Sequence, residues 1–186
     1  MKNLVIAAHL DDEILGMGGF LALKSYEGDQ NTIITVCRGR DQQNFLKRSE
    51  VVEEFCTTFH INHIILPNWD LSLDKVSRAE LGEKIFSWIE FLGLKWDRIF
   101  IPSSKDVHFE HRIVSDVAKV AIRNVTFQAL YEVKNPGDPF NTDIFDTSHL
   151  INNNIFDKVN FVKKFTTENI PEIPDYEFFK TIKASI

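Results

Sequence analysis

The chain has 186 residues, of which 44% are hydrophobic and 26% are charged, and its formal net charge is -6. This composition is typical of a soluble globular chain with one core and excludes the disordered and fibrous classes. Because the charge is negative and no long run of Lys or Arg occurs, the sequence argues against nucleic acid as a partner.

Alternation of strand and helix is the main pattern along the chain. Short apolar runs predict buried strands over 3–8, 32–37, 63–66, 98–101 and 126–133. Helical periodicity predicts helices over 12–26, 45–59, 77–91 and 110–122, and Ser77 with Glu80 has the spacing of a capping box. We therefore expect an α/β fold with a doubly wound, Rossmann-like, mostly parallel sheet in three αβα layers.

The end of the chain has a different pattern. Residues 134–139 read Lys-Asn-Pro-Gly-Asp-Pro, which predicts a turn-rich connection. We expect a single domain over 1–186, with an α/β core at 1–135 and a short irregular C-terminal extension at 136–186 that packs near the active-site mouth. Two short helices are predicted in this extension, near 157–165 and 175–182.

Several features limit the choice of function. The N-terminal apolar stretch is too short for a secretion signal or a membrane span, which predicts a cytoplasmic protein. Cys37 and Cys56 show no CxxC spacing, so any metal should be bound by histidine and carboxylate. The glycines of Gly16-Met17-Gly18-Gly19 lie inside a predicted helix without GxGxxG spacing, which favours close helix–sheet packing over dinucleotide binding.

Two clusters of imidazole and carboxylate follow predicted strands. His9-Leu10-Asp11-Asp12-Glu13 comes directly after the first strand, and Asp106-Val107-His108-Phe109-Glu110-His111 comes shortly after the fourth. Ligands of parallel sheets bind at the carboxyl ends of the strands, and the first and fourth strands should be neighbours. Two imidazoles and one carboxylate with an open position form the ligand set of catalytic zinc hydrolases, and His9, Asp12 and His111 fit that role.

Each cluster by itself also has an ordinary explanation. The acidic residues 11–13 could cap a helix and complement its dipole, and His108 and His111 could be surface residues. Their joint placement at the expected ligand-binding edge of one sheet favours a site.

These residues resemble the motifs of the PIG-L/LmbE-like N-deacetylase family, A-H-P-D-D-E and H-P-D-H. The chain reads Ala8-His9-Leu10-Asp11-Asp12-Glu13 and His108-Phe109-Glu110-His111, and the resemblance covers residues 1–135. The resemblance implies that His9, Asp12 and His111 bind Zn²⁺ or another divalent transition metal. It also implies that Asp11 is the general base and that His108 stabilises the oxyanion.

Three positions depart from these motifs, because Leu10 and Phe109 replace proline and Glu110 replaces aspartate. The proline changes remove stiffness from the loops but no ligand. The longer Glu110 displaces a carboxylate by about 1 Å, which can reduce a rate about 100-fold. We expect Asp106 or Glu110 to contact the His108 ring, orient it and keep it protonated.

Charged residues that follow the second and third strands or lie in the second helix are candidates for binding the substrate: Arg40, Asp41, Arg48 and Asp70. Arg48 would suit an anionic group such as phosphate. Solvated loop charges or a surface ion pair explain each of these residues equally well.

The sequence therefore predicts a hydrolase that removes an N-acetyl or other N-acyl group from a small molecule, by attack of a metal-activated water on the amide carbonyl. The resemblance implies an amino sugar or sugar conjugate as the substrate. Two alternatives stay open: a metal- or sugar-binding protein without useful catalysis, which Glu110 favours, and a mononucleotide-binding fold without metal. A homo-oligomer is compatible with the sequence.

Overall fold

The computed structural model describes residues 1–93, 95–122, 127–131, 143–146, 156–165 and 176–183. Its strands are β1 (Lys2–His9), β2 (Gln30–Cys37), β3 (Asn62–Asn68), β4 (Arg98–Pro102), β5 (Phe127–Tyr131), β6 (Asp143–Asp146) and β7 (Tyr176–Lys183). Its helices are α1 (Asp12–Tyr26), α2 (Gln42–Thr58), the 3₁₀ helix η1 (Leu73–Lys75), α3 (Arg78–Phe91), α4 (Phe109–Ala121) and α6 (Lys158–Phe165).

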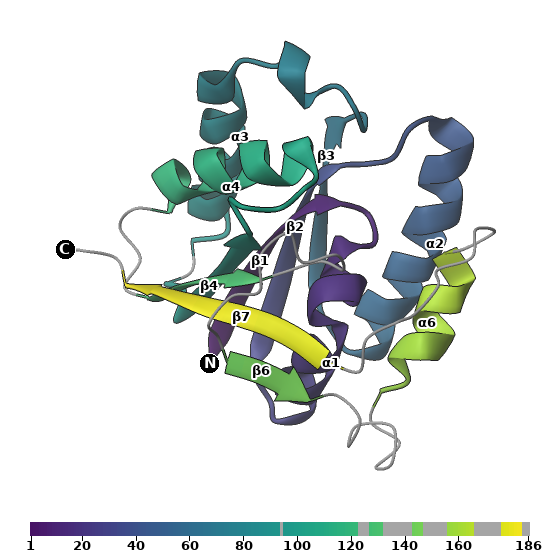
Figure 1. Ribbon diagram of the computed structural model, residues 1–186. Helices are drawn as coiled ribbons and strands as arrows, with labels where there is room; N and C mark the ends of the chain where they lie inside the picture. Colours follow the sequence, from purple (N-terminus) through teal and green to yellow (C-terminus); the bar gives the residue numbers. More distant parts are fainter. Residues whose placement is uncertain (94, 123–126, 132–142, 147–155, 166–175, 184–186) are drawn as a thin grey trace.

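The described strands form one sheet in the order β3-β2-β1-β4-β5-β7-β6 (Figure 1). Strands β1 to β5 pair in parallel, whereas β7 pairs antiparallel with both β5 and β6. The prediction that the first and fourth strands are neighbours is confirmed by the β1–β4 pairing. This pairing places the loops that follow β1 and β4 at the same edge of the sheet.

The central strand β1 divides its buried side chains between two cores. Val5 and Ala7 pack with the core that includes α1 and α2, and Leu4, Ile6 and Ala8 pack with the core that includes α3 and α4. Side chains of a strand alternate between the two faces of its sheet, so both faces must be covered by helices. Figure 1 shows α1, α2 and α6 on one face and α3 and α4 on the other, and the predicted three-layer α/β fold is confirmed.

Most of the predicted core elements are present, with small differences at their ends. Helix α2 begins at Gln42 instead of 45 because the side chain of Asp41 caps it, accepting a hydrogen bond of 2.8 Å from the backbone N–H of Asn44. The capping box at Ser77 is wrong, since the Ser77 side chain makes no capping hydrogen bond and Glu80 instead pairs with Lys84 at 2.9 Å. Residues 126, 132 and 133 of the last predicted core strand lie outside the described residues.

The C-terminal part contains the main error of the sequence prediction. The helix predicted near 157–165 is confirmed as α6, but the helix predicted at 175–182 is wrong, because β7 occupies 176–183. Strand β6 was not predicted, and the turn at 134–139 lies outside the described residues. The edge of β5 offers β7 a long antiparallel pairing, from Phe127–Lys183 to Tyr131–Phe179, and the aromatic and β-branched residues of β7 favour a strand.

The C-terminal segment packs against the glycine cluster of α1. A Cβ atom on Gly18 would lie 2.9 Å from Cζ of the buried Phe156, so only glycine admits this ring. The buried carboxylate of Glu177 on β7 accepts hydrogen bonds from the backbone N–H groups of Gly19 (2.7 Å) and Phe20 (2.8 Å). The glycines therefore serve packing, as predicted, although the ring that approaches Gly18 belongs to the segment before α6 and not to the sheet.

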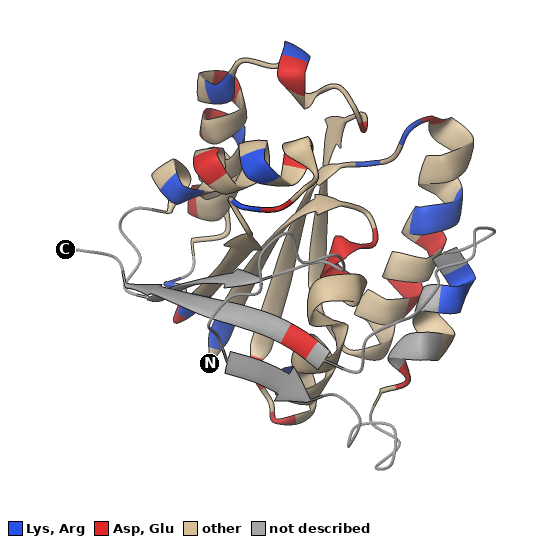
Figure 2. Cartoon of the chain, viewed as in Figure 1, with Lys and Arg blue, Asp and Glu red and all other residues tan. Residues whose placement is uncertain are grey.

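Figure 2 shows acidic and basic residues interspersed along the described helices, while β1 to β4 carry few charges. None of the helices in the described part of the chain combines the length and apolar character needed to cross a bilayer.

Candidate metal centre

The two clusters predicted from the sequence meet at the carboxyl ends of β1 and β4. A cavity of about 280 Å³ opens at this edge of the sheet. It is lined by side chains from both clusters and from the loops after β2 and β3: His9, Asp11, Asp12, Leu15, Arg40, Arg48, Asp70, Leu71, Asp106, Val107, His108, Glu110 and His111.

Three potential ligand atoms converge at one point, namely His9 Nδ1, Asp12 Oδ2 and His111 Nε2. His9 Nδ1 and His111 Nε2 are 3.1 Å apart. Asp12 Oδ2 lies 3.4 Å from His9 Nδ1 and 3.1 Å from His111 Nε2. Atoms bound at roughly 2.0–2.1 Å to one tetrahedral zinc ion are about 3.3 Å apart. The donor set thus fits a single tetrahedral ion and leaves its fourth position to a non-protein ligand.

The outer nitrogens of both imidazoles contact carboxylates. His9 Nε2 lies 2.9 Å from Glu110 Oε2, and His111 Nδ1 lies 2.9 Å from Asp106 Oδ2. A ring nitrogen that donates its proton to a carboxylate leaves the opposite nitrogen with a free lone pair. When the outer nitrogens donate in this way, the inner nitrogens of His9 and His111, which face Asp12, can present their lone pairs to a metal ion.

The electrostatics favour positive charge at this point. Burial opposes charging of both imidazoles, but the Asp12 carboxylate raises the pKa of His111 to about 10 and the pKa of His9 well above its usual value. Burial by itself raises the pKa of Asp12, but the adjacent His111 has the stronger effect and holds that pKa well below its usual value. Asp12 is therefore ionised, as a carboxylate metal ligand must be.

Asp11 lies beside the three converging residues and precedes α1. Its backbone has the unusual angles φ 155° and ψ -28°, and its Oδ2 lies 3.2 Å from a guanidinium nitrogen of Arg48. Burial and the charge of Asp12 raise the pKa of Asp11 to about 7, against the opposing effect of Arg48. A carboxylate with such a pKa can accept a proton near neutral pH.

His108 precedes α4, and its ring stands at 82° to that of His9 with the ring centroids 4.7 Å apart. The expectation that Asp106 or Glu110 contacts the His108 ring is wrong. Glu110 binds His9, and Asp106 Oδ1 accepts a hydrogen bond of 2.7 Å from the backbone N–H of His108 instead. The reason is that these carboxylates are used by the two imidazoles on either side.

The His108 ring is consequently not held in its protonated form. In the described part of the chain its buried Nδ1 atom has no hydrogen-bond partner. Burial lowers the pKa of His108, and the imidazoles of His9 and His111 lower it further. A neutral His108 ring follows from this arrangement.

Of the residues predicted to bind substrate, Arg40, Arg48 and Asp70 line the cavity. Arg48 also lies 3.8 Å from Asp70 Oδ2, so it bridges two carboxylates of the site. Asp41 does not line the cavity, and its side chain caps α2.

Some lining residues were not found from the sequence. Leu15 on α1 and the loop residues Leu71 and Val107 add apolar surface to the cavity. Apolar residues in loops give no periodic signal, and the helical period of α1 does not show that Leu15 faces a cavity. The lack of CxxC spacing argued against Cys37 as a metal ligand, yet its sulfur lies within 4.8 Å of potential ligand atoms of His9 and Asp70. Its place at the carboxyl end of a predicted strand was the available signal.

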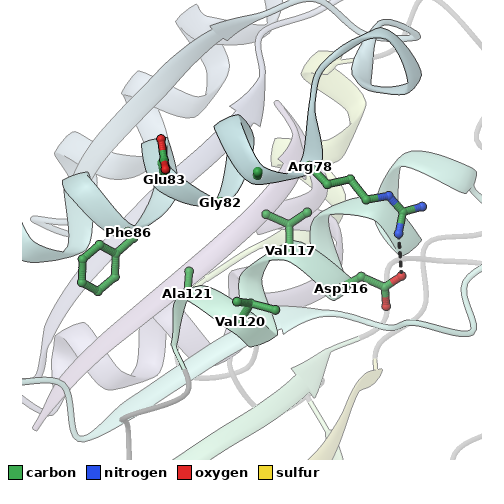
Figure 3. A pocket seen from close by; sticks show the side chains of 9 residues that line it. Arg78, Gly82, Glu83, Phe86, Asp116, Val117, Val120 and Ala121 are labelled. Atoms are coloured by element: carbon green, nitrogen blue, oxygen red, sulfur yellow. Dashed lines mark ion pairs between the residues drawn. The ribbon is translucent and has the colours of Figure 1, made fainter.

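A larger cavity of about 600 Å³ lies between α3 and α4 (Figure 3). Small and apolar residues such as Gly82 and Val117 line it, and an ion pair of 3.5 Å joins Arg78 and Asp116 there. No histidine is found among the described residues that line this cavity, whereas His9, His108 and His111 line the smaller one.

Comparison with known proteins adds to this geometry. Residues 4–122 match the family model PIG-L, GlcNAc-PI de-N-acetylase. No curated protein matches the sequence.

Several solved structures share the fold. N,N'-diacetylchitobiose deacetylase from Pyrococcus horikoshii has a TM-score of 0.76 at 17% identity, over 98% of this chain and 84% of that one. The zinc inhibited form of teicoplanin deacetylase Orf2 has a TM-score of 0.71 at 16% identity, over 89% of this chain and 84% of that one. GalB, the 4-carboxy-2-hydroxymuconate hydratase from Pseudomonas putida KT2440, has a TM-score of 0.74 at 13% identity, over 100% and 98% of the two chains.

Proposed function

Because the chain belongs to the PIG-L family (GlcNAc-PI de-N-acetylase), we propose that it removes an N-acetyl or other N-acyl group from an amino sugar or sugar conjugate. The observation that carries this proposal is the convergence of His9, Asp12 and His111 to within 3.1–3.4 Å of one another, beside the carboxylate of Asp11, which pairs with Arg48. Deacetylases of diacetylchitobiose and of teicoplanin share the fold, which supports a sugar amide as substrate.

His9 Nδ1, Asp12 Oδ2 and His111 Nε2 would hold the metal, which would be Zn²⁺ or another divalent transition ion. When bound, the ion lowers the pKa of a coordinated water to about 7 and polarises the amide carbonyl. Glu110 and Asp106 hold the two imidazole rings in orientation from behind.

Asp11 is the carboxylate beside the ligands that is not itself a ligand. It accepts a proton from the attacking water and later delivers it to the amine that leaves. Arg48, at 3.2 Å, fixes the Asp11 carboxylate in place and stabilises its ionised form. A pKa of about 7 suits both steps, since the group can take up and release a proton near neutral pH.

His108, which lines the cavity beside the proposed metal ligands, would stabilise the oxygen that becomes negative in the tetrahedral intermediate. A neutral imidazole can donate one N–H to this oxyanion, and such a preorganised donor is worth about 100–1,000-fold in rate. Protonation of the ring, which was expected from the sequence, is not required for this role.

The remaining lining side chains bind the sugar. Arg40 and Asp70 supply a donor and an acceptor for hydroxyl groups, while Arg48 is occupied by Asp11 and Asp70. The position of Asp41 as the cap of α2 keeps it out of this set. The expectation that part of residues 136–186 packs near the cavity mouth stays a prediction, since no described residue of that segment lines the cavity.

The test is amine release from a panel of N-acetylated amino sugars and their conjugates, using zinc-loaded protein with and without chelator. The proposal predicts amine release that chelator abolishes and zinc restores. Binding of a panel member without any amine release would favour the alternative of a sugar-binding protein without catalysis. Amine release that survives complete metal removal would contradict the proposed mechanism.

A further inference from the structure

The carboxylate of Glu110 binds backbone amides as well as a histidine ring. It is fully buried, and besides contacting His9 Nε2 its Oε2 accepts a hydrogen bond of 2.9 Å from the backbone N–H of Leu71. Its Oε1 accepts hydrogen bonds of 3.1 Å from the backbone N–H groups of Ser72 and Leu73. One side chain on α4 thus binds the imidazole at the end of β1 and three successive amides after β3.

The segment from Trp69 to Leu73, here called the rim loop, is held in a conformation that it would not adopt alone. Leu71 has φ 60°, which is unfavourable for a residue with a bulky side chain. Such conformations persist only where several surrounding contacts hold them in place, and they are most frequent at functional sites. The hydrogen bonds that Glu110 accepts hold the rim loop in this conformation from one side.

The other side of the rim loop is fixed to the loop after β2. Asp70 N–H donates to the carbonyl of Gly39, and Gly39 N–H donates to Asp70 Oδ1, both at 2.9 Å. The Trp69 ring lies against the guanidinium of Arg38, whose central carbon is 3.7 Å from the ring centroid. Asp70 and Leu71, which line the cavity, are therefore held between two anchors.

The rim loop also presents apolar surface at the cavity. The side chain of Leu71 lines the cavity although the residue is 53% exposed, and Val107, before α4, lines it while 65% exposed. Apolar side chains that remain exposed at the edge of a polar cavity are available to contact a ligand.

We propose that Glu110 is a positioning residue that couples the metal ligand His9 to the rim loop, and that Leu71, so placed, contacts an apolar part of the substrate. The second half of this proposal rests on the proposed function, and the first half rests on it only in naming His9 a metal ligand; the contacts of Glu110 with His9 and the rim loop do not depend on it. It also accounts for the glutamate at this position, because an aspartate is one methylene shorter and cannot keep both His9 and the rim loop in contact from the same backbone position.

The first half is tested by hydrogen exchange of the backbone amides of residues 71–73 in the zinc-loaded protein. Wild-type amides should be protected despite their place in a loop, and Glu110→Gln and Glu110→Asp should each exchange about tenfold faster or more at these positions. Unprotected amides in the wild type, or unchanged exchange in both variants, would overturn the proposal.

Glu177→Gln is the matched control. Glu177 is also a buried glutamate that accepts two backbone N–H groups, but it lies on β7 and does not line the cavity. This variant should lower stability without a selective effect at residues 71–73. Equal acceleration at residues 71–73 in Glu177→Gln and in the Glu110 variants would reduce Glu110 to a general stabilising residue and overturn the proposal.

The second half is tested with Leu71→Ala on an amide that the wild type hydrolyses and that carries an apolar group. KM should rise by about threefold or more, with the loss in kcat/KM coming mainly from KM. The rise should shrink for the same amide without its apolar group. Equal KM values of Leu71→Ala and wild type on the apolar amide would refute the contact. Absence of amine release by the wild type would refute the proposed function and leave the exchange result to decide the role of Glu110.

Discussion

His9 Nδ1 and His111 Nε2 lie 3.1 Å apart, although 102 positions separate the two residues in the chain. Two imidazole lone pairs at this distance repel each other unless a proton or a cation lies between them. The carboxylate of Asp12, 3.1 Å from His111 and 3.4 Å from His9, supplies the negative charge that stabilises such a cation. The pair therefore has the geometry of a metal site, and its consequences can be measured.

Removal of one imidazole should abolish the metal site. We expect His111→Ala to lose stoichiometric zinc binding, measured by elemental analysis after dialysis, because one carboxylate and one imidazole hold zinc weakly. Asp106→Asn, which removes the carboxylate behind His111, should weaken zinc affinity by about 10–100-fold. The exposed His60 provides the control, and His60→Ala should bind zinc as the wild type does. Stoichiometric zinc in His111→Ala would exclude this site.

Loss of Asp11, the proposed general base, should separate binding from turnover. Asp11→Asn keeps the shape of the side chain but cannot accept the proton, so kcat for amide hydrolysis should fall by about 100–10,000-fold. Zinc content, measured on the same preparation, should remain that of the wild type, because Asp11 is not a ligand in the proposed set. Undiminished amine release by this variant would remove Asp11 from the mechanism.

The glycines of two helices should respond in opposite ways to alanine. In Gly18→Ala the new Cβ would lie 2.9 Å from Phe156 Cζ, and we expect the free energy of unfolding to fall by about 1–3 kcal/mol. Gly82 lies in α3 at the cavity of Figure 3, where a Cβ would meet Val117 Cγ1 at an ordinary 3.4 Å. Gly82→Ala should therefore raise the free energy of unfolding by about 0.5–1 kcal/mol.

Urea denaturation of both variants and the wild type measures this difference. A stable Gly18→Ala protein would show that Phe156 can move away from α1, contrary to the packing described. A destabilised Gly82→Ala protein would mean that the cavity between α3 and α4 is filled in solution.

A partly buried histidine should make stability depend on pH. His63 lies on β3, 2.9 Å from Thr35 Oγ1, and burial lowers its pKa to about 4. The unfolded chain takes up a proton near pH 6.5, whereas the folded protein does not until about pH 4. Stability from this residue is thus complete above about pH 6.5 and is lost as the pH falls toward 4.

The measurement is the free energy of unfolding of wild type and His63→Gln at about pH 7.5 and pH 5. Between these conditions the wild type should lose on the order of 1–2 kcal/mol more than the variant. Comparison of the two proteins cancels the contributions of the other titrating groups. Equal pH dependence in both would show that His63 becomes protonated in the folded protein.

The core of the fold followed from the sequence because its signals are local. Burial of β1 on both faces appears as an uninterrupted apolar run, and α1 has the same bounds in the prediction and in the structure, Asp12–Tyr26. The helix prediction at 175–182 failed for a different reason. The segment 176–183 is rich in aromatic and β-branched residues, which favour a strand, and that local signal was not used; its pairing with β5, about 50 positions earlier, completes the strand.

The sequence by itself determined which donor groups are present and at which edge of the sheet they lie, because strand ends and motif residues are read from neighbouring positions. Only the tertiary structure decided which carboxylate serves which imidazole. Glu110 reaches His9 and the rim loop rather than His108, and Asp106 reaches His111. Partners of a buried side chain are set by elements that approach from distant parts of the chain, and side-chain orientation at that distance leaves no periodic trace in the sequence.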